Sequence, residues 1–371
     1  MARCLEAYPP ERLAHIRDRT EWAWHSANAT QAYDDRIAYL VHSTCENEVS
    51  RDFPVPADAT EVQAEMIRQL QGMAYNAATE CERYPGFASG IEQVTIPSMF
   101  GCVTEGIADS NRIRPVIKSP SDVYSLPPAE IREGTVCHAM LSRIAETHRR
   151  ARGRLPVYMT DIQGPFSCAA QMWGIEDFLG ALGDHESEIH HLLSLCTEAI
   201  IRYFEAMYDA TDGTLIPIHC FPYLWVPRDC GVAVSDDFFA IVGTETVRDF
   251  SVPYLERIGA AFGGVTVHTC GNMNHLPAEM NAMKTLRAVN FSSSETDLAR
   301  YARACDPRIA ILAHQSGMSI GGLPVLDVAG QLRHCAATQR DTGVTVIALW
   351  PWAPEPADAP HRAAWHRATQ L

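Results

Sequence analysis

The stretch VTVHTCGNMNHLPAEMNAMKTLRAVNFSSSETDLARYARACDPRIAILAH (265–314) alternates short β-type runs with helical segments. Its apolar runs are 265–268, 286–292 and 308–314, and the segments between them carry apolar residues at helical spacing. Because these runs are apolar on both faces, the alternation predicts parallel strands that are covered by helices.

Working outward from this stretch, five further runs have the same character. They lie at 36–42, 93–97, 155–162, 214–219 and 344–350. Eight strands that alternate with helices predict an α/β fold of the closed (β/α)₈, or TIM, barrel type. The open, doubly wound alternative would need a GxGxxG turn after its first strand, and the sequence has none.

The spacing of the strands predicts the domain organisation. Residues 1–35 are expected to form a helical N-terminal extension, and residues 36–371 the barrel. A long insertion is expected at about 220–258, and it contains the aromatic stretch FPYLWVP (221–227). Long insertions after barrel strands usually shape or cover a pocket.

Acidic side chains outnumber basic ones by 45 to 30, which gives a formal net charge of −15 over 371 residues. A chain this acidic repels phosphate backbones and anionic lipid, so we expect neither nucleic acid nor a membrane as a partner. No run of about 18 apolar residues predicts a membrane span. The acidic residues within 1–30 are atypical of a targeting peptide, and the twelve cysteines form no CxxC pair. We therefore expect a cytoplasmic protein with reduced thiols that acts on a small molecule.

Titratable residues gather where the expected strands end. In a (β/α)₈ barrel the carboxyl ends of the strands form the active-site face, so this concentration on one rim indicates catalysis. The residues are Glu46, Glu105, Asp161, His219, Cys220, His268, Cys270, Glu295 and His314.

The most specific of these signals is His268-Thr269-Cys270. A histidine and a cysteine two residues apart at a strand end can face the same point, and imidazole with thiolate suits Zn²⁺. A catalytic zinc needs a third protein ligand, for which Glu295 and His314 are the nearest candidates and His219 a more distant one. The competing interpretation is a hydrogen-bonded rim histidine beside a buried thiol.

Two further stretches are candidates for contact with a cofactor. Gly164 follows Asp161 and precedes a helix that opens with proline, and a glycine there lets a ligand approach the backbone closely. Tyr223 and Trp225 could stack on a flat ligand. The alternative is that these aromatic rings pack the insertion itself.

Several of these segments resemble the uroporphyrinogen decarboxylase superfamily. Residues 161–169 (DIQGPFSCA) are similar to its "GxPxTLA" helix, and GVAVSDDF (231–238) with Pro253-Tyr254 is similar to its "G–LSPxxFxxFxxPY" element. HTCGN (268–272) follows at the expected distance, and Arg114–Pro127 resembles a further conserved stretch. The resemblance covers about 90–350 and implies a (β/α)₈ barrel with a helical N-terminal extension.

Within that superfamily the residues favour one branch. The arginine-rich N-terminal loop and the final GHG turn of the true decarboxylases have no counterpart here. The methyltransferase branch holds zinc with an HxC motif and a later cysteine, and His268 and Cys270 match the first two ligands. Leu349 stands where the later cysteine is expected, so Glu295 or His314 would complete the site.

The resemblance thus implies a zinc-dependent methyltransferase that moves a methyl group between a corrinoid, or another methylated small molecule, and a thiol. Glu105 matches a glutamate of that branch, and with Asp161 and His314 it would orient substrate or move protons. A corrinoid protein is an implied partner and a homodimer an implied assembly.

Two other functions stay open from the sequence. One is a metal-free lyase that acts on a carboxylated substrate, for which Arg112, Arg114 and Arg228 would supply positive charge. The other is a non-enzymatic protein that uses the mouth of the barrel as a receptor.

Overall fold

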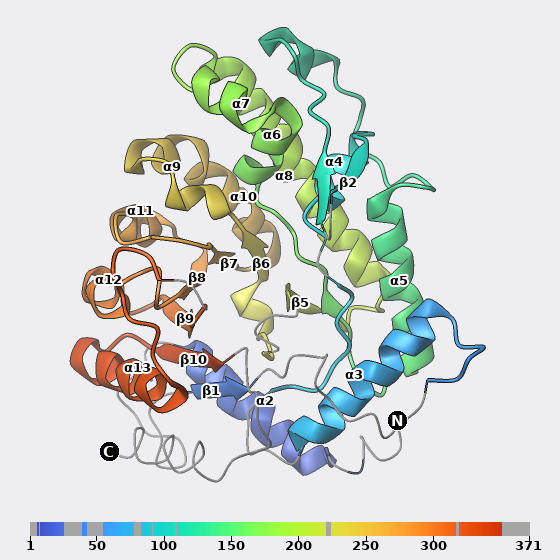
Figure 1. The fold of residues 1–371 in the computed structure, drawn as a ribbon, viewed down its shortest axis with the longest axis vertical. Coiled ribbons are helices and arrows are strands. Elements are labelled where there is room, and N and C mark those ends of the chain that lie inside the picture. Colours follow the sequence, from blue (N-terminus) through green and yellow to red (C-terminus); the bar gives the residue numbers. More distant parts are fainter. Residues whose placement is uncertain are drawn as a thin grey trace.

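A ring of helices surrounds parallel strands in the computed structural model of the chain (Figure 1). The structure describes residues 6, 8–25, 39–42, 55–77, 83–90, 92–107, 110–219, 224–316 and 319–350.

The main sheet has six parallel strands in the order β1-β10-β9-β8-β7-β6. Their bounds are β1 Tyr39–His42, β6 Val232–Ser235, β7 Val265–His268, β8 Leu286–Ser292, β9 Ala310–His314 and β10 Val346–Trp350. Every residue of β6 and β9 is buried, as expected for strands that are covered on both faces.

Two isolated bridges extend the parallel arrangement beyond β6. Gln163, which follows β4 (Tyr158–Met159), pairs with Ser235, and Phe87 pairs with Val157. The segment around Phe87, β4, the five strands β6 to β10 and β1 therefore form a series of eight parallel segments. This arrangement confirms the (β/α)₈ fold class.

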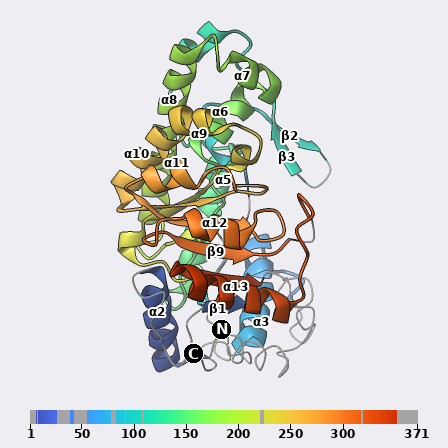
Figure 2. The same cartoon turned by 90° about the vertical axis from the view of Figure 1, so that its left-hand side faces the viewer.

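The remaining elements surround this series. β5 (Ile216–His219) pairs with β4, and an antiparallel hairpin extends away from the strands (Figure 2). The hairpin consists of β2 (Thr104–Ile107) and β3 (Ser110–Ile113). The helices are α2 Pro10–Trp24, α3 Glu61–Ala77, α4 Thr95–Met99, α5 Val136–Ala151, α6 Pro165–Trp173, α7 Ile175–Ala181, α8 Glu186–Asp209, α9 Thr244–Phe250, α10 Val252–Phe262, α11 Pro277–Ala282, α12 Leu298–Ala304 and α13 Val328–Thr342, with 3₁₀ turns η3 Pro120–Ser125, η4 Arg228–Cys230 and η5 Asp237–Ala240.

Most predicted strands are confirmed. The runs 265–268 and 286–292 coincide with β7 and β8, and 308–314 and 344–350 contain β9 and β10. These runs are continuous apolar segments bounded by turn residues, which is the pattern that a strand buried on both faces imposes. The division into 1–35 and 36–371 stays a prediction.

One predicted strand is wrong, and one strand of the main sheet is not predicted. Residues 93–97, expected as a strand, lie in a turn and the short helix α4, and the Phe87 segment takes that place in the series. The expected insertion at 220–258 contains β6, a strand of the main sheet. β6 is only four residues of small and β-branched side chains, too short for its periodicity to stand out.

Among the helices that the structure describes, none combines the length and the apolar character needed to cross a bilayer.

Gly231, immediately before β6, provides a test of this strand packing. Its φ is +72°, and a Cβ atom placed there would lie 1.8 Å from the carbonyl oxygen of Gly264. We expect Gly231→Ala to lower the free energy of unfolding by about 3 kcal/mol or more, because the neighbouring backbone must shift. Denaturant titration would measure the change.

Gly343 is the matched control. Its φ is +73°, but a Cβ atom there would meet nothing within 4 Å. Gly343→Ala should therefore cost only the left-handed backbone penalty, about 1–2 kcal/mol. Equal losses for the two variants would contradict the close approach of Gly231 to Gly264.

Candidate metal centre and adjoining pocket

Asp237, His268 and Cys270 come together at the carboxyl ends of β6 and β7. One potential ligand atom from each residue lies within 4.8 Å of the other two. The Nε2 atom of His268 is 3.3 Å from the Sγ atom of Cys270 and 4.0 Å from the Oδ1 atom of Asp237. No other group of three or more such residues was found in the described part of the chain.

The backbone around Thr269 places the histidine and the cysteine on one side. Thr269 is fully buried. Its N–H donates to the carbonyl oxygen of Asn290 at 3.0 Å, and its hydroxyl donates to the carbonyl oxygen of Asp236 at 3.0 Å. Since alternate residues on an extended chain face opposite sides, His268 and Cys270 both face away from these anchors.

Asp237 reaches the same point from the neighbouring strand. It opens η5 directly after β6, and the N–H of Asp236 donates to the carbonyl oxygen of His268 at 2.8 Å. The N–H of Cys270 donates to the Oδ1 atom of Asp237 at 2.8 Å. The carboxylate is thereby tied to the loop that carries the thiol.

The side chain of Asn290 fixes the tautomer of His268. Its Nδ2 atom donates to the carbonyl oxygen of Leu312 at 2.6 Å, which only accepts, so its Oδ1 atom faces the Nδ1 atom of His268 at 2.6 Å. An amide oxygen also only accepts, and therefore Nδ1 carries the proton. In the neutral ring the lone pair is then on Nε2, the atom that faces Cys270 and Asp237.

His314, predicted as a catalytic residue, joins this network from the end of β9. Its ring stacks on that of His268 with 5.9 Å between centroids. Its Nδ1 atom is 3.3 Å from the Nδ2 atom of Asn290, which has a second proton to donate. His314 is 5% exposed, so it supports the candidate centre from within the barrel.

Cys270 is the one exposed residue among the eight cysteines that the structure describes. Although the residue as a whole is exposed, its sulfur is partly shielded from water, and this desolvation, with the carboxylates of Asp237, Glu295 and Asp161 nearby, raises the pKa of the Cys270 thiol to about 12. Without a cation the group is a thiol at neutral pH. A divalent ion would offset the negative charge that holds the proton in place.

The three groups fit zinc in donor type and spacing. Zinc takes imidazole nitrogen, thiolate sulfur and carboxylate oxygen, and a tetrahedral site brings ligand atoms to about 3.3–3.8 Å from one another. The observed separations of 3.3 Å and 4.0 Å need only small side-chain movements to reach this range. Three protein ligands leave one position open, as in catalytic zinc sites.

Glu295, predicted as the third ligand, lies beside the candidate centre but is not one of the three clustered groups. Its Oε2 atom accepts from the N–H of Gly271 at 2.6 Å, and its Oε1 atom accepts from the hydroxyl of Ser316. With both oxygens so engaged and the side chain 3% exposed, Glu295 holds the loop after Cys270. Asp237 is instead the carboxylate that lies beside His268 and Cys270. Its signal in the sequence is the pair Asp236-Asp237 directly after an apolar run.

Asp161 and Gly164 lie between β4 and α6, beside the end of β6. The Oδ1 atom of Asp161 accepts from the hydroxyl of Ser235 at 2.7 Å, and its Oδ2 atom accepts from the Nε2 atom of Gln163 at 3.4 Å. The N–H of Gly164 donates to the carbonyl oxygen of Ser235 at 2.7 Å. A Cβ atom on Gly164 would lie 2.7 Å from the Oδ2 atom of Asp236, so only glycine fits.

Asp236 is a fully buried carboxyl next to this candidate metal centre. Its Oδ1 atom accepts from the hydroxyl of Ser167 at 2.8 Å, whereas its Oδ2 atom has no hydrogen-bond partner among the described residues. Burial, opposed only in part by the Ser167 hydrogen bond, raises the pKa of Asp236 to about 8. The side chain therefore keeps its proton near neutral pH.

The other predicted site residues are not brought to this point. Trp225 packs on the N-terminal helix: its Nε1 atom donates to Glu21 at 3.1 Å, and its ring lies 4.9 Å from that of Tyr84. This is the packing alternative for the aromatic stretch. The structure describes only the backbone of Glu105 and His219, and Glu46, Cys220 and Tyr223 lie outside the described residues.

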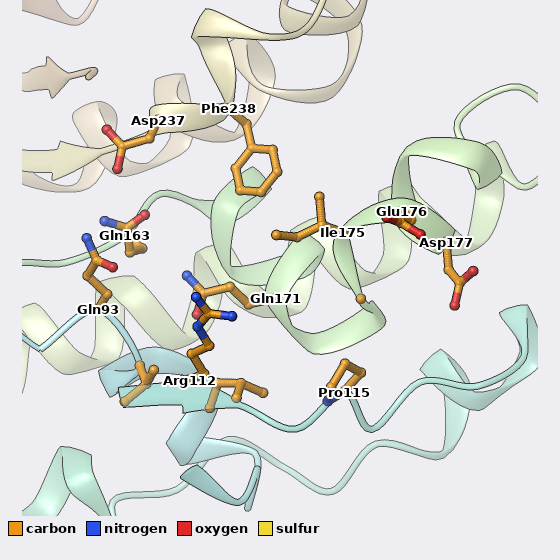
Figure 3. A pocket seen from close by; sticks show the side chains of 13 residues that line it. Gln93, Arg112, Pro115, Gln163, Gln171, Ile175, Glu176, Asp177, Asp237 and Phe238 are labelled. Atoms are coloured by element: carbon orange, nitrogen blue, oxygen red, sulfur yellow. The ribbon is translucent and has the colours of Figure 1, made fainter. Parts of the chain in front are cut away.

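A cavity of about 660 Å³ adjoins the candidate metal centre, and Asp237 lines it. Figure 3 shows Gln93 and Gln163 beside Asp237, Arg112 and Gln171 together near the middle, and Phe238 above Ile175. The cavity therefore combines amide groups, one cation and the three carboxylates of Glu176, Asp177 and Asp237 with an apolar wall. The full lining is Gln93, Val94, Arg112, Ile113, Pro115, Gln163, Gln171, Gly174, Ile175, Glu176, Asp177, Asp237 and Phe238.

Asp236 should make stability depend on pH. Because its pKa in the fold is about 8, against 3.8 for an ordinary aspartate, its contribution to stability is complete below pH 3.8 and is lost as the pH rises towards 8. Asp236→Asn removes this titration. We expect the wild-type free energy of unfolding to fall relative to that of the variant between pH 5 and 8, by up to about 1.4 kcal/mol per pH unit.

Denaturant titrations in chelator-containing buffer across that pH range would measure the difference. Asp341→Asn, at an exposed position, is the control and should give a pH-independent difference. A difference for Asp236→Asn that stays constant from pH 5 to 8 would show that the carboxyl is ionised in the fold.

Comparisons with known proteins agree with the architecture. Residues 90–216 match the model of the uroporphyrinogen decarboxylase (URO-D) family. A solved methyltransferase from Methanosarcina mazei superposes with a TM-score of 0.61 at 13% identity, over 94% of this chain and 97% of that chain. No curated protein matches the sequence. The family match and the shared fold confirm the predicted resemblance to the uroporphyrinogen decarboxylase superfamily.

Proposed function

We propose that the chain is a zinc-dependent methyltransferase that moves a methyl group between a corrinoid, or another methylated small molecule, and a thiol acceptor. The observation that carries this proposal is the convergence of Asp237, His268 and Cys270 at the edge of a cavity. The structural similarity to a methyltransferase from Methanosarcina mazei supports the general reaction class.

In this proposal Asp237, His268 and Cys270 hold the ion. Bound zinc would lower the pKa of a thiol in the open position, so that the acceptor is a thiolate at neutral pH. During transfer a sulfur–carbon bond forms at the acceptor while the bond between methyl group and donor breaks, and the donor keeps the electron pair.

The surrounding residues position these groups. Asn290 keeps the lone pair of His268 Nε2 directed at the candidate metal centre. Asp161 holds the amide of Gln163, which lines the cavity. Arg112 supplies the cavity with a positive charge for the substrate. Preorganised partners of this kind lower the reorganisation needed at the moment of reaction.

A metal-free lyase that acts on a carboxylated substrate is the second candidate. The match to the URO-D family model and the position of Arg112 in the cavity favour it. Decarboxylation needs a cation or hydrogen-bond donors near the developing negative charge, and Arg112 with Gln171 would supply them. This function would not require Cys270.

Zinc content separates the two candidates. Purified wild-type protein should retain about one zinc per chain after dialysis. Loss of a residue that only orients a metal ligand costs about 10–100-fold in affinity. Cys270→Ser and Asp237→Asn each remove a ligand itself, so they should weaken zinc binding by more than this. Glu295→Gln and the exposed Asp249→Asn are controls that should keep the ion, as measured by elemental analysis.

A wild-type protein free of zinc would refute this function, and zinc loss in Glu295→Gln but not in Asp237→Asn would refute the ligand set. For the reaction itself, methylcobalamin and 2-mercaptoethanol serve as probes, with the methylated thiol detected by mass spectrometry. Activity on a tetrapyrrole carboxylate that survives in Cys270→Ser would favour the lyase.

Asn290 offers a finer test of the same centre. Asn290→Leu removes the acceptor for His268 Nδ1–H, so the ring can adopt the other tautomer and zinc affinity should fall by about 10–100-fold. Chelator competition would measure the affinity, and nitrogen-15 shifts of His268 would report the tautomer. Ser293 directly follows β8, and Ser293→Ala, which loses a 2.8 Å hydrogen bond to Gln331 of α13, should leave both unchanged.

A further inference from the structure

Four arginines surround a second, smaller cavity. Arg149, Arg150, Arg152 and Arg154 line a space of about 280 Å³. In a chain with a net charge of −15, this is a local reversal of sign. The arginines come from the last turn of α5 and the loop after it, in the stretch HRRARGR (148–154).

This cavity lies away from the candidate metal centre. The loop 152–154 leads into β4, so it is at the amino ends of the parallel strands. Asp237, His268 and Cys270 follow the carboxyl ends. Figure 1 shows the end of α5 beside α3, and Arg143 of α5 pairs with Glu61 of α3 at 2.8 Å.

The charges of the cluster are only partly balanced. Glu146 accepts from Arg149 at 2.7 Å and also pairs with Arg150, and this pairing lowers the pKa of Glu146. The guanidinium groups of Arg152 and Arg154 make no hydrogen bond or ion pair with any described residue. Glu146 therefore pairs with two of the four guanidinium groups.

Stabilisation of the helix dipole accounts for only half of the cluster. Basic side chains in the last turn of a helix interact favourably with its carbonyl groups, and Arg149 and Arg150 occupy such positions. Arg152 is the C-cap, in a left-handed conformation with φ of 54°, and Arg154 lies beyond it. Their convergence on one cavity needs another explanation.

A third cavity, of about 440 Å³, shares Arg150 with the arginine-lined cavity. Pro56, Ala59, Met66 and Ile67 provide apolar walls. Asp58 and Gln63 also line it and offer polar atoms. A single ligand could thus place a strongly anionic part among the arginines and a less polar part beside α3.

We propose that these two cavities form a binding site for a phosphorylated small molecule of the nucleoside diphosphate class. Guanidinium groups bind phosphate oxygens in a planar, two-pronged geometry that suits a cluster of arginines. Phosphate would supply the negative charge that Glu146 alone does not. Because the site lies at the opposite ends of the strands, its ligand is distinct from the methyl-transfer substrates.

Isothermal titration with inorganic pyrophosphate and with ADP tests the site. The full-length wild-type protein should bind both in about 150 mM salt, where nonspecific attraction is screened, and ADP should bind more tightly. The double variant Arg152→Gln/Arg154→Gln should weaken both by about tenfold or more, since charge-assisted hydrogen bonds are lost. Ile67→Asn should weaken ADP binding only.

Arg248→Gln/Arg257→Gln removes two charges on another face and is the matched control. Circular dichroism would verify that every variant folds. Absence of pyrophosphate binding to the wild type, or equal affinities in the two double variants, would overturn the site. ADP binding no tighter than pyrophosphate would overturn the ligand class.

Discussion

The side-chain amide of Asn290 is the constraint on which the candidate metal centre depends. It spans three adjacent strands: it donates to Leu312 on β9, accepts from His268 on β7 and itself belongs to β8. The backbone carbonyl of Leu312 can only accept a hydrogen bond, so it fixes which end of the Asn290 amide faces it. The amide oxygen then faces His268 and fixes the tautomer of the histidine. The hydrogen bonds of Asn290 thereby direct the lone pair of His268 Nε2 towards the candidate metal centre.

Three aspartates that lie close together have different roles because their surroundings differ. Asp161 shares its two oxygens between Ser235 and Gln163. Asp236 is sealed against Gly164 and keeps its proton. Asp237 is partly exposed and faces the histidine and the cysteine. The neighbouring ends of β4 and β6 thus bring together a positioning group, a neutral buried acid and a candidate ligand.

Much of the fold, and about half of the candidate centre, could be predicted from the sequence. β7 and β8 were found because each is an apolar run of the length that a covered strand requires, and the same reasoning placed His268 and Cys270 at one rim. Asp237 is not among the predicted ligands because β6 falls within the predicted insertion, where its four residues do not stand out as a strand. Glu295 was at the right rim, but the hydrogen bonds from Gly271 and Ser316 that engage it depend on loop geometry.

β2 and β3 pair with each other in an antiparallel hairpin, which is separate from the sheet of parallel strands. It carries Arg112, the only cation that lines the large cavity within the described residues. The candidate metal centre at the ends of β6 and β7 and the cation of the adjoining cavity therefore lie on separate units of the chain. Substitutions in this short hairpin would consequently change the charge of the cavity while the parallel strands stay the same.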